Sequence, residues 1–187
     1  MSPLNPANIP LSLYIHMPWC VRKCPYCDFN SHAVPDGELS LDLEQQYLAA
    51  LVADFETQVE MAQGRSIHSV FIGGGTPSLI SAQGYQWLFD QLKARLDFEA
   101  GCEITLEANP GTVEHDPFAD YLAVGINRLS LGVQSFDPEH LQRLGRIHSA
   151  NNALDAIQQA RQAGFERVNV DLMHGLPQQT EQQALTD

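Results

Sequence analysis

The sequence predicts an α/β fold, a partial (β/α) barrel of the TIM type that stops after about five strands. Short apolar runs rich in β-branched and aromatic residues alternate with longer segments of helical periodicity. The alternation repeats five times within 187 residues, whereas a closed eight-stranded barrel takes about 250. We therefore expect parallel strands joined by right-handed crossovers, buried on both faces because the runs are nearly all apolar. The predicted strands are Leu11–His16, His68–Ile72, Glu103–Glu107, Asn127–Val133 and Arg167–Leu172.

Helices are predicted between these strands. Ser40 can cap the first helix, whose apolar stripe runs from Tyr47 to Val59. A second helix is expected from about Ser81 to Leu96, with leucines on one face. Two later helices are predicted to stop at Gly125 and Gly164, because glycine readily adopts the left-handed conformation that ends a helix.

The last residues predict the beginning of another helix. Thr180 and Gln183 have the spacing of a capping box, in which each residue satisfies a backbone N–H of the other. The sequence ends at Asp187, short of the roughly 11–12 residues of a mean helix. We expect residues 1–187 to be the N-terminal portion of a larger core domain, with the rest of the barrel and a C-terminal domain absent from this chain.

Composition and charge exclude several classes of protein. A chain that is 44% hydrophobic and 18% charged is neither disordered nor fibrous. Its net charge of -13 repels phosphate backbones, so we expect no nucleic-acid partner. No stretch approaches the roughly 18 apolar residues of a transmembrane helix, and no secretory pattern opens the chain. A cytoplasmic protein is expected.

Three cysteines lie together just after the first predicted strand. Cys20, Cys24 and Cys27 can aim three thiolates at a common centre from one short loop. Arg22 and Lys23 are expected to favour thiolate formation by offsetting its negative charge. Three cysteines cannot ligate all four irons of a cubane cluster, so one iron would remain open to a non-protein ligand.

Other interpretations of the cysteines remain. Zinc could take the three cysteines plus His16 or His32, although no second pair of closely spaced cysteines is present. A disulfide is not expected in a chain without a secretory pattern. Cys102 stands alone at the start of a predicted strand, where it is expected to be a small buried hydrophobic residue.

Glycines and polar residues follow the other predicted strands. Residues 73–77 read Gly-Gly-Gly-Thr-Pro, which matches neither a Walker A loop nor G-x-G-x-x-G, so phosphate binding is not favoured. Instead, glycines let a backbone approach a ligand closely. Glu107, Gln134 and Asp171 end the next three strands. Because the C-terminal ends of parallel barrel strands carry the functional residues, we expect these side chains to share one site.

Together these motifs resemble the radical S-adenosylmethionine (SAM) superfamily. Its signature is matched by Cys-x₃-Cys-x₂-Cys with Tyr26 before the third cysteine, and its glycine motif by residues 73–77. Within the superfamily, the chain is similar to the group of oxygen-independent coproporphyrinogen III oxidases and HemW-type heme chaperones. That similarity is carried by Tyr14-Ile-His-Met-Pro18, Glu107-Ala-Asn-Pro110, Gly132-Val-Gln-Ser-Phe136, Arg146 and Asp171 through Pro177. The implied fold is a radical SAM barrel.

The resemblance also implies cofactors and roles. Cys20, Cys24 and Cys27 would ligate a [4Fe–4S] cluster, with SAM on the open iron. Glu107 and Asp171 suit an ammonium, a sulfonium or ribose hydroxyls, and Arg146 suits a carboxylate. The full SAM-binding set would be Tyr14, Tyr26, Gly74, Gly75, Thr76, Glu107, Gln134, Arg146 and Asp171.

One position separates the two branches of this group. The oxidases carry a fourth cysteine two residues after the third, and here Phe29 takes that place. The resemblance therefore favours a chaperone that binds heme and delivers it to acceptor proteins, with a small electron-donor protein as a further partner. No catalytic residue is assigned. The alternatives are an oxidase that decarboxylates coproporphyrinogen III by a 5′-deoxyadenosyl radical, and a zinc-stabilised binding module.

Overall fold

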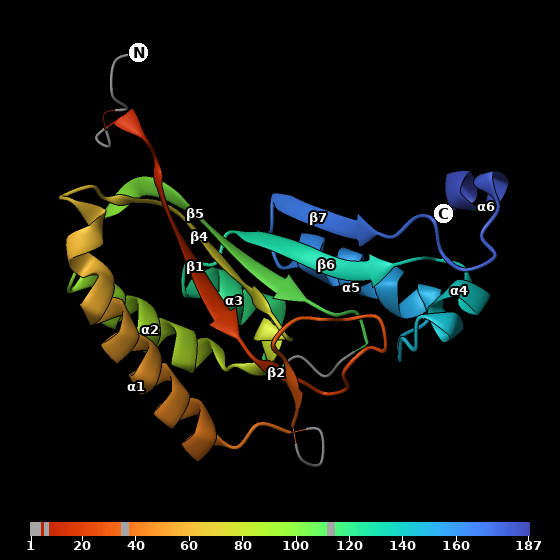
Figure 1. Cartoon of the computed structure of the whole chain (residues 1–187), viewed down its shortest axis with the longest axis horizontal. Helices are drawn as coiled ribbons and strands as arrows, with labels where there is room; N and C mark the ends of the chain where they lie inside the picture. Colours follow the sequence, from red (N-terminus) through yellow and green to blue (C-terminus); the bar gives the residue numbers. More distant parts are fainter. Residues whose placement is uncertain (1–4, 6–7, 35–37, 112–114) are drawn as a thin grey trace.

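The chain folds around one five-stranded parallel sheet whose strands follow one another in sequence order (Figure 1). The computed structural model describes residues 5, 8–34, 38–111 and 115–187. All five predicted strands are present, each in the predicted order, so the α/β prediction is confirmed. The strands are β1 (Leu11–Met17), β4 (Ile67–Gly74), β5 (Phe98–Ala108), β6 (Arg128–Gln134) and β7 (Arg167–Leu172).

The core lies between one face of this sheet and four helices. Alternate strand residues such as Ile72, Leu106 and Leu131 are fully buried against this helical layer. The other face of the sheet carries no helix in Figure 1. Among the residues described, no helix is long and apolar enough to cross a bilayer. The covering helices are α1 (Leu41–Gln58), α2 (Ala82–Lys93), α3 (Phe118–Ala123) and α5 (Ala150–Gln162).

The helix ends form where the sequence places them. The Ser40 and Ser81 side chains cap α1 and α2 by accepting the N–H of the third helical residue. Thr180 and Gln183 form the predicted capping box at the start of α6 (Glu181–Thr186). After α3 and α5, Gly125 and Gly164 take positive φ values of 103° and 100°, as a glycine helix stop requires.

Three local features differ from the sequence prediction. β5 begins at Phe98, so Cys102 lies inside the strand and is partly exposed, and the prediction that it is buried is wrong. A short helix, α4 (Pro138–Arg143), follows β6. Strands β2 (Trp19–Cys20) and β3 (His32–Ala33) pair in parallel and close the segment that holds the cysteines.

Burial of the strands on both faces holds for β6 but not for β1, β4 or β7, and in β7 no residue is buried. In β6 all five interior residues are buried. On the face of the sheet away from the helices, Tyr14 of β1 is 57% exposed and Phe71 of β4 is 37% exposed. The prediction fails there because it took apolar runs as buried throughout, whereas these two aromatics lie on the open face.

Candidate functional site

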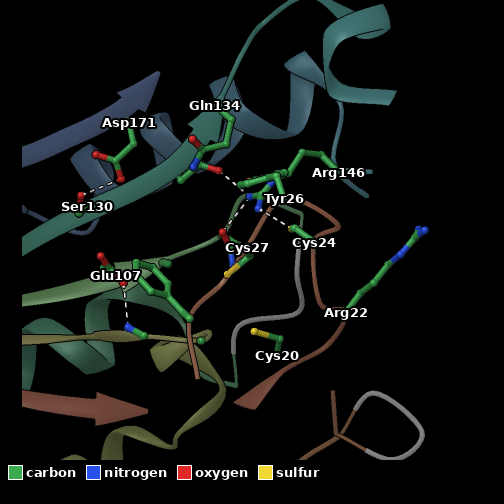
Figure 2. A pocket seen from close by; sticks show the side chains of 16 residues that line it. Cys20, Arg22, Cys24, Tyr26, Cys27, Glu107, Ser130, Gln134, Arg146 and Asp171 are labelled. Atoms are coloured by element: carbon green, nitrogen blue, oxygen red, sulfur yellow. Dashed lines mark hydrogen bonds between the residues drawn. The ribbon is translucent and has the colours of Figure 1, made fainter. Parts of the chain in front are cut away.

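A cavity of about 310 Å³ lies at the C-terminal ends of the strands. The cysteine loop forms one side of it, and the ends of β4 to β7 form the other (Figure 2). Of the predicted site residues, only Tyr14 and Thr76 are not in its lining. Those that line it are Cys20, Cys24, Tyr26, Cys27, Gly74, Gly75, Glu107, Gln134, Arg146 and Asp171. Residues that the sequence did not assign to the site also line it, namely Arg22, Phe29, Ala108, Asn109, Ser130 and Gly132.

The cysteine loop is closed by its own lysine. Lys23 Nζ donates to the carbonyl oxygens of Phe29 at 3.1 Å and Ser31 at 3.2 Å. The ammonium of Lys23 thus binds loop carbonyls, and its role in favouring thiolate formation stays a prediction. At Cys20 burial raises the thiol pKa, and the nearby hydroxyls of Thr76 and Ser31 partly offset this rise.

The glycine segment after β4 is attached to the entry of the cysteine loop by backbone bonds. Gly75 N donates to Met17 O and Thr76 N donates to Trp19 O, each at 2.6 Å. A Cβ on Gly75 would lie 2.4 Å from Trp19 O, so only glycine allows this approach. The glycines thus bring two chain segments together and leave backbone of Gly74 and Gly75 on the cavity wall.

Two carboxyl groups face the cavity from β5 and β7. Glu107 accepts a bond from Gly74 N at 3.2 Å, and Asp171 accepts one from Ser130 Oγ at 3.1 Å. Burial raises the pKa of Glu107, the Gly74 N–H lowers it, and the nearby Asp171 raises it further. In Figure 2 the two side chains lie on the same side of the cavity, opposite the cysteine loop.

Arg146 links the cysteine loop to the strand ends. It enters from the segment between α4 and α5 and donates to Asn109 Oδ1 at 2.8 Å and Gly132 O at 2.6 Å. Its other terminal nitrogen lies 3.5 Å from Cys24 Sγ (Figure 2). A residue that precedes a helix in sequence is thus placed among the strand-end residues, as the resemblance implied.

Gln134, at the end of β6, has an unusual backbone conformation. Its φ of 70° is in the left-handed region, which is costly for a residue with a Cβ and is enriched at functional sites. Its carbonyl accepts the N–H of Met173 at 2.8 Å. The strained residue is therefore held by the chain that follows β7.

Tyr14 and Thr76 have other contacts. The Tyr14 hydroxyl lies 3.0 Å from His16 Nδ1, and its ring stacks on Phe71. Thr76 is buried, and its hydroxyl accepts a hydrogen bond from Asn109 Nδ2 at 3.0 Å. Thr76 thereby orients Asn109, the residue to which Arg146 donates.

The two histidines of the zinc interpretation do not face the cavity with the cysteines. His16 Nε2 lies 2.9 Å from Asn30 O, and His32 is exposed on β3. Neither lines the cavity. Within the described part of the chain, no three His, Cys, Asp or Glu side chains are arranged to hold a single metal ion. A cubane binds its thiolates at separate iron corners, so the cysteines need not converge on one point.

Comparison with known families agrees with this arrangement. The family profile described as the Radical SAM superfamily matches residues 14–186. The chain belongs to the radical SAM superfamily. Membership implies a [4Fe–4S] cluster and SAM as the cofactors, and it confirms the superfamily resemblance drawn from the motifs.

Curated relatives narrow the similarity within the superfamily. The chain is 53% identical to the heme chaperone HemW of Haemophilus influenzae and 55% identical to that of Escherichia coli, each over 95% of this chain and 46% of the relative. The chain thus spans about half the length of these relatives. Among solved structures, coproporphyrinogen III oxidase HemN of Escherichia coli aligns with a TM-score of 0.82 and 32% identity, covering 97% of this chain and 41% of HemN.

Proposed function

We propose that this protein is a heme chaperone of the radical SAM superfamily, which binds a [4Fe–4S] cluster and SAM and delivers heme to acceptor proteins. The observation that carries the proposal is the cavity that gathers the three motif cysteines with the polar strand-end residues. The HemW relatives at 53% and 55% identity support the chaperone branch.

The cavity has the chemistry that the two cofactors require. Cys20, Cys24 and Cys27 would hold the cluster, which supplies one iron open to a non-protein ligand. Across the cavity, Glu107 and Asp171 can accept hydrogen bonds from ribose hydroxyls or an ammonium group. Arg146 offers guanidinium donors to a carboxylate.

Phe29 favours the chaperone over the oxidase. It lines the cavity and is 57% exposed, at the position where the oxidases of this group carry a fourth cysteine. An apolar ring there adds no thiolate beside the cluster. The HemN similarity nevertheless makes the oxidase the second candidate, and the two activities can be measured on one sample.

Cluster assembly tests the cysteine assignment. We expect anaerobic reconstitution of the full-length protein with iron and sulfide to give a four-iron cluster, and Cys24→Ala to abolish it, because two thiolates retain a cubane poorly. Cys102→Ala is the matched control, since Cys102 lies in β5, outside the cavity lining. Zinc retained without iron uptake, or a full cluster in Cys24→Ala, would contradict the assignment.

Heme titration and a coproporphyrinogen III assay then separate the two functions. A chaperone should bind heme stoichiometrically and transfer it to an apo-acceptor protein, without forming decarboxylated product. Product formation without stoichiometric heme binding would contradict the chaperone function and support the oxidase function.

A further inference from the structure

Ser31, just after the cysteine loop, has a buried hydroxyl without a hydrogen-bond partner. The residue is 2% exposed, and its Oγ forms no hydrogen bond within the part of the chain that the structure describes. Its backbone is paired, since Ser31 N donates to Phe29 O at 2.7 Å and Ser31 O accepts from Lys23 Nζ at 3.2 Å. A buried hydroxyl without a partner costs free energy, so this one calls for an acceptor that the loaded protein supplies.

Strand pairing places Ser31 beside Cys20, one of the three predicted cluster ligands. His32, the next residue, donates its N–H to Pro18 O at 2.6 Å, and Val34 N donates to Cys20 O at 2.9 Å, so that β3 pairs with β2. The Ser31 hydroxyl lies near enough to the Cys20 sulfur to oppose the rise that burial causes in the pKa of the thiol. Cys20 is itself only 9% exposed, so bulk water has little access to the contact.

The strength of the Cys20 sulfur as an acceptor depends on whether it ligates iron. A cysteine thiol is a weak acceptor, whereas the sulfur of a metal-bound cysteine is a thiolate. Hydrogen bonds to an ionised acceptor are about twice as strong as those between neutral groups. The Ser31 O–H therefore has a strong acceptor within reach when Cys20 holds the cluster.

Ser31 can influence the cofactors only through Cys20. It does not line the cavity, so it lies outside the surface to which SAM would bind. Thr76 also has its hydroxyl near the Cys20 sulfur, but it is assigned to SAM by resemblance and accepts a bond from Asn109 Nδ2. Ser31 thus offers a contact with the sulfur that can be removed without changing a predicted SAM-binding side chain.

We propose that Ser31 is a positioning residue of the cluster, whose hydroxyl donates a hydrogen bond to Cys20 Sγ when this sulfur ligates the [4Fe–4S] cluster. The inference rests on the cluster binding in the proposed function and extends it to the reduction potential. A low-potential one-electron donor adds one electron to the oxidised cluster, with no bond formed or broken. Part of the added negative charge falls on the cysteine sulfurs. A donor at the sulfur stabilises this charge, so Ser31 raises the reduction potential of the cluster.

A redox titration of the full-length, reconstituted protein tests this hydrogen bond. The titration is read at the potential where half of the clusters in the unaltered protein are reduced. There the ratio of reduced to oxidised cluster should fall about threefold or more in Ser31→Ala, because the donor is lost. Electron paramagnetic resonance of the reduced cluster, with dithionite as the reductant, measures the ratio. The iron content should not change, since all three cysteines remain.

Deuterium exchange gives a second measurement of the same bond. After exchange into D2O, pulsed electron paramagnetic resonance detects deuterons that are coupled to the reduced cluster. Ser31→Ala should lose one exchangeable deuteron relative to the unaltered protein. A role of Ser31 in folding alone would leave this coupling as it is.

Ser78→Ala is the matched control. Ser78 lies in the short 3₁₀ helix η4 (Pro77–Leu79), is 0% exposed, and its hydroxyl also has no hydrogen-bond partner among the residues described. It does not line the cavity. Each substitution removes a buried hydroxyl that bonds to nothing in the cluster-free protein, so neither should lower the urea concentration at which that protein unfolds. Only Ser31→Ala should change the ratio of reduced to oxidised cluster.

The outcomes separate this inference from the proposed function. An unchanged ratio in Ser31→Ala, with the cluster intact, would overturn the inference and leave the proposed function standing. An equal fall in Ser78→Ala would ascribe the effect to packing and refute it as well. A Ser31→Ala protein that loses iron, or unfolds more readily without its cluster, would assign the hydroxyl to the fold. If the unaltered protein assembles no four-iron cluster, the proposed function fails and the inference fails with it.

Discussion

Glu44 of α1 holds the first turn of α2 through Ser81. Its carboxylate accepts the Ser81 hydroxyl at 2.6 Å and the Ser81 backbone N–H at 2.9 Å, and the residue is only 3% exposed. A buried carboxylate is stabilised here because the N-terminal end of a helix presents unpaired N–H groups and a positive dipole end.

We expect Glu44→Ala to destabilise the fold by about 2–4 kcal/mol, because it leaves buried donors of Ser81 without an acceptor. Urea unfolding followed by circular dichroism measures the loss. Glu60→Ala, at an exposed acidic position, is the control and should change stability by less than about 0.5 kcal/mol. Equal effects of the two substitutions would show that the Glu44 contacts add no stability.

Gly75→Ala tests the close approach of the glycine segment to β2. The new Cβ would lie 2.4 Å from Trp19 O, a backbone atom, so the chain itself must shift. We expect a loss of about 3 kcal/mol or more and weaker cluster retention. Gly101→Ala, at a positive φ of 78° but with no atom within 4 Å of the new Cβ, should cost only about 1 kcal/mol. A Gly75→Ala protein as stable as the Gly101→Ala protein would contradict the geometry.

His148 should make the fold sensitive to mild acid. Burial and the neighbouring Arg146 together lower its pKa from 6.5 to about 4, against a smaller opposing effect of the hydrogen bond to Val133 O. Because the unfolded chain binds this proton more readily, stability is complete above about pH 6.5 and falls as the pH drops toward 4. The loss between pH 7 and pH 5 should be about 2 kcal/mol.

The control for this prediction is His148→Gln, whose amide can still donate to Val133 O as His148 Nε2 does at 3.0 Å. The difference in unfolding free energy between pH 7 and pH 5 should shrink by about 2 kcal/mol in this variant. An unchanged pH dependence would assign the acid sensitivity to other groups.

Arg146→Lys should weaken SAM binding while the cluster remains. A lysine has one nitrogen, so it cannot contact Asn109 and Gly132 on one side and Cys24 Sγ on the other, as the two terminal nitrogens of the planar guanidinium do. We expect SAM affinity to fall at least tenfold by calorimetry on reconstituted protein, with the iron content unchanged. Arg143→Lys, at an exposed position of α4, is the control. Unaltered SAM affinity in Arg146→Lys would remove Arg146 from the binding site.

The strand order and most of the site were predictable because parallel strands end at one edge of a sheet. Glu107, Gln134 and Asp171 could be grouped from sequence for that reason alone. Ser130 and Gly132 were missed, although they alternate with Leu129, Leu131 and Val133 along β6 and so share the face of Gln134. Period-two alternation within the strand was the sign that could have found them.

Features that depend on distant contacts were not predictable. β2 and β3 have two residues each and exist only because His32 N reaches Pro18 O and Val34 N reaches Cys20 O. The packing of the Tyr14 ring on Phe71 depends on strand register, whereas the assignment of Tyr14 to SAM by resemblance stays a prediction. The predicted further strands and C-terminal domain stay a prediction.

The backbone bonds from Gly75 and Thr76 to Met17 and Trp19 have a consequence for how this protein can vary. Because only main-chain atoms of residues 17 and 19 take part, those side chains can be exchanged without breaking the link. The number of residues between β1 and Cys20 cannot change, since an inserted or deleted residue would shift the loop carbonyls away from the N–H groups of Gly75 and Thr76. At residues 17 and 19, the length of the chain and not the identity of the side chains preserves these backbone bonds.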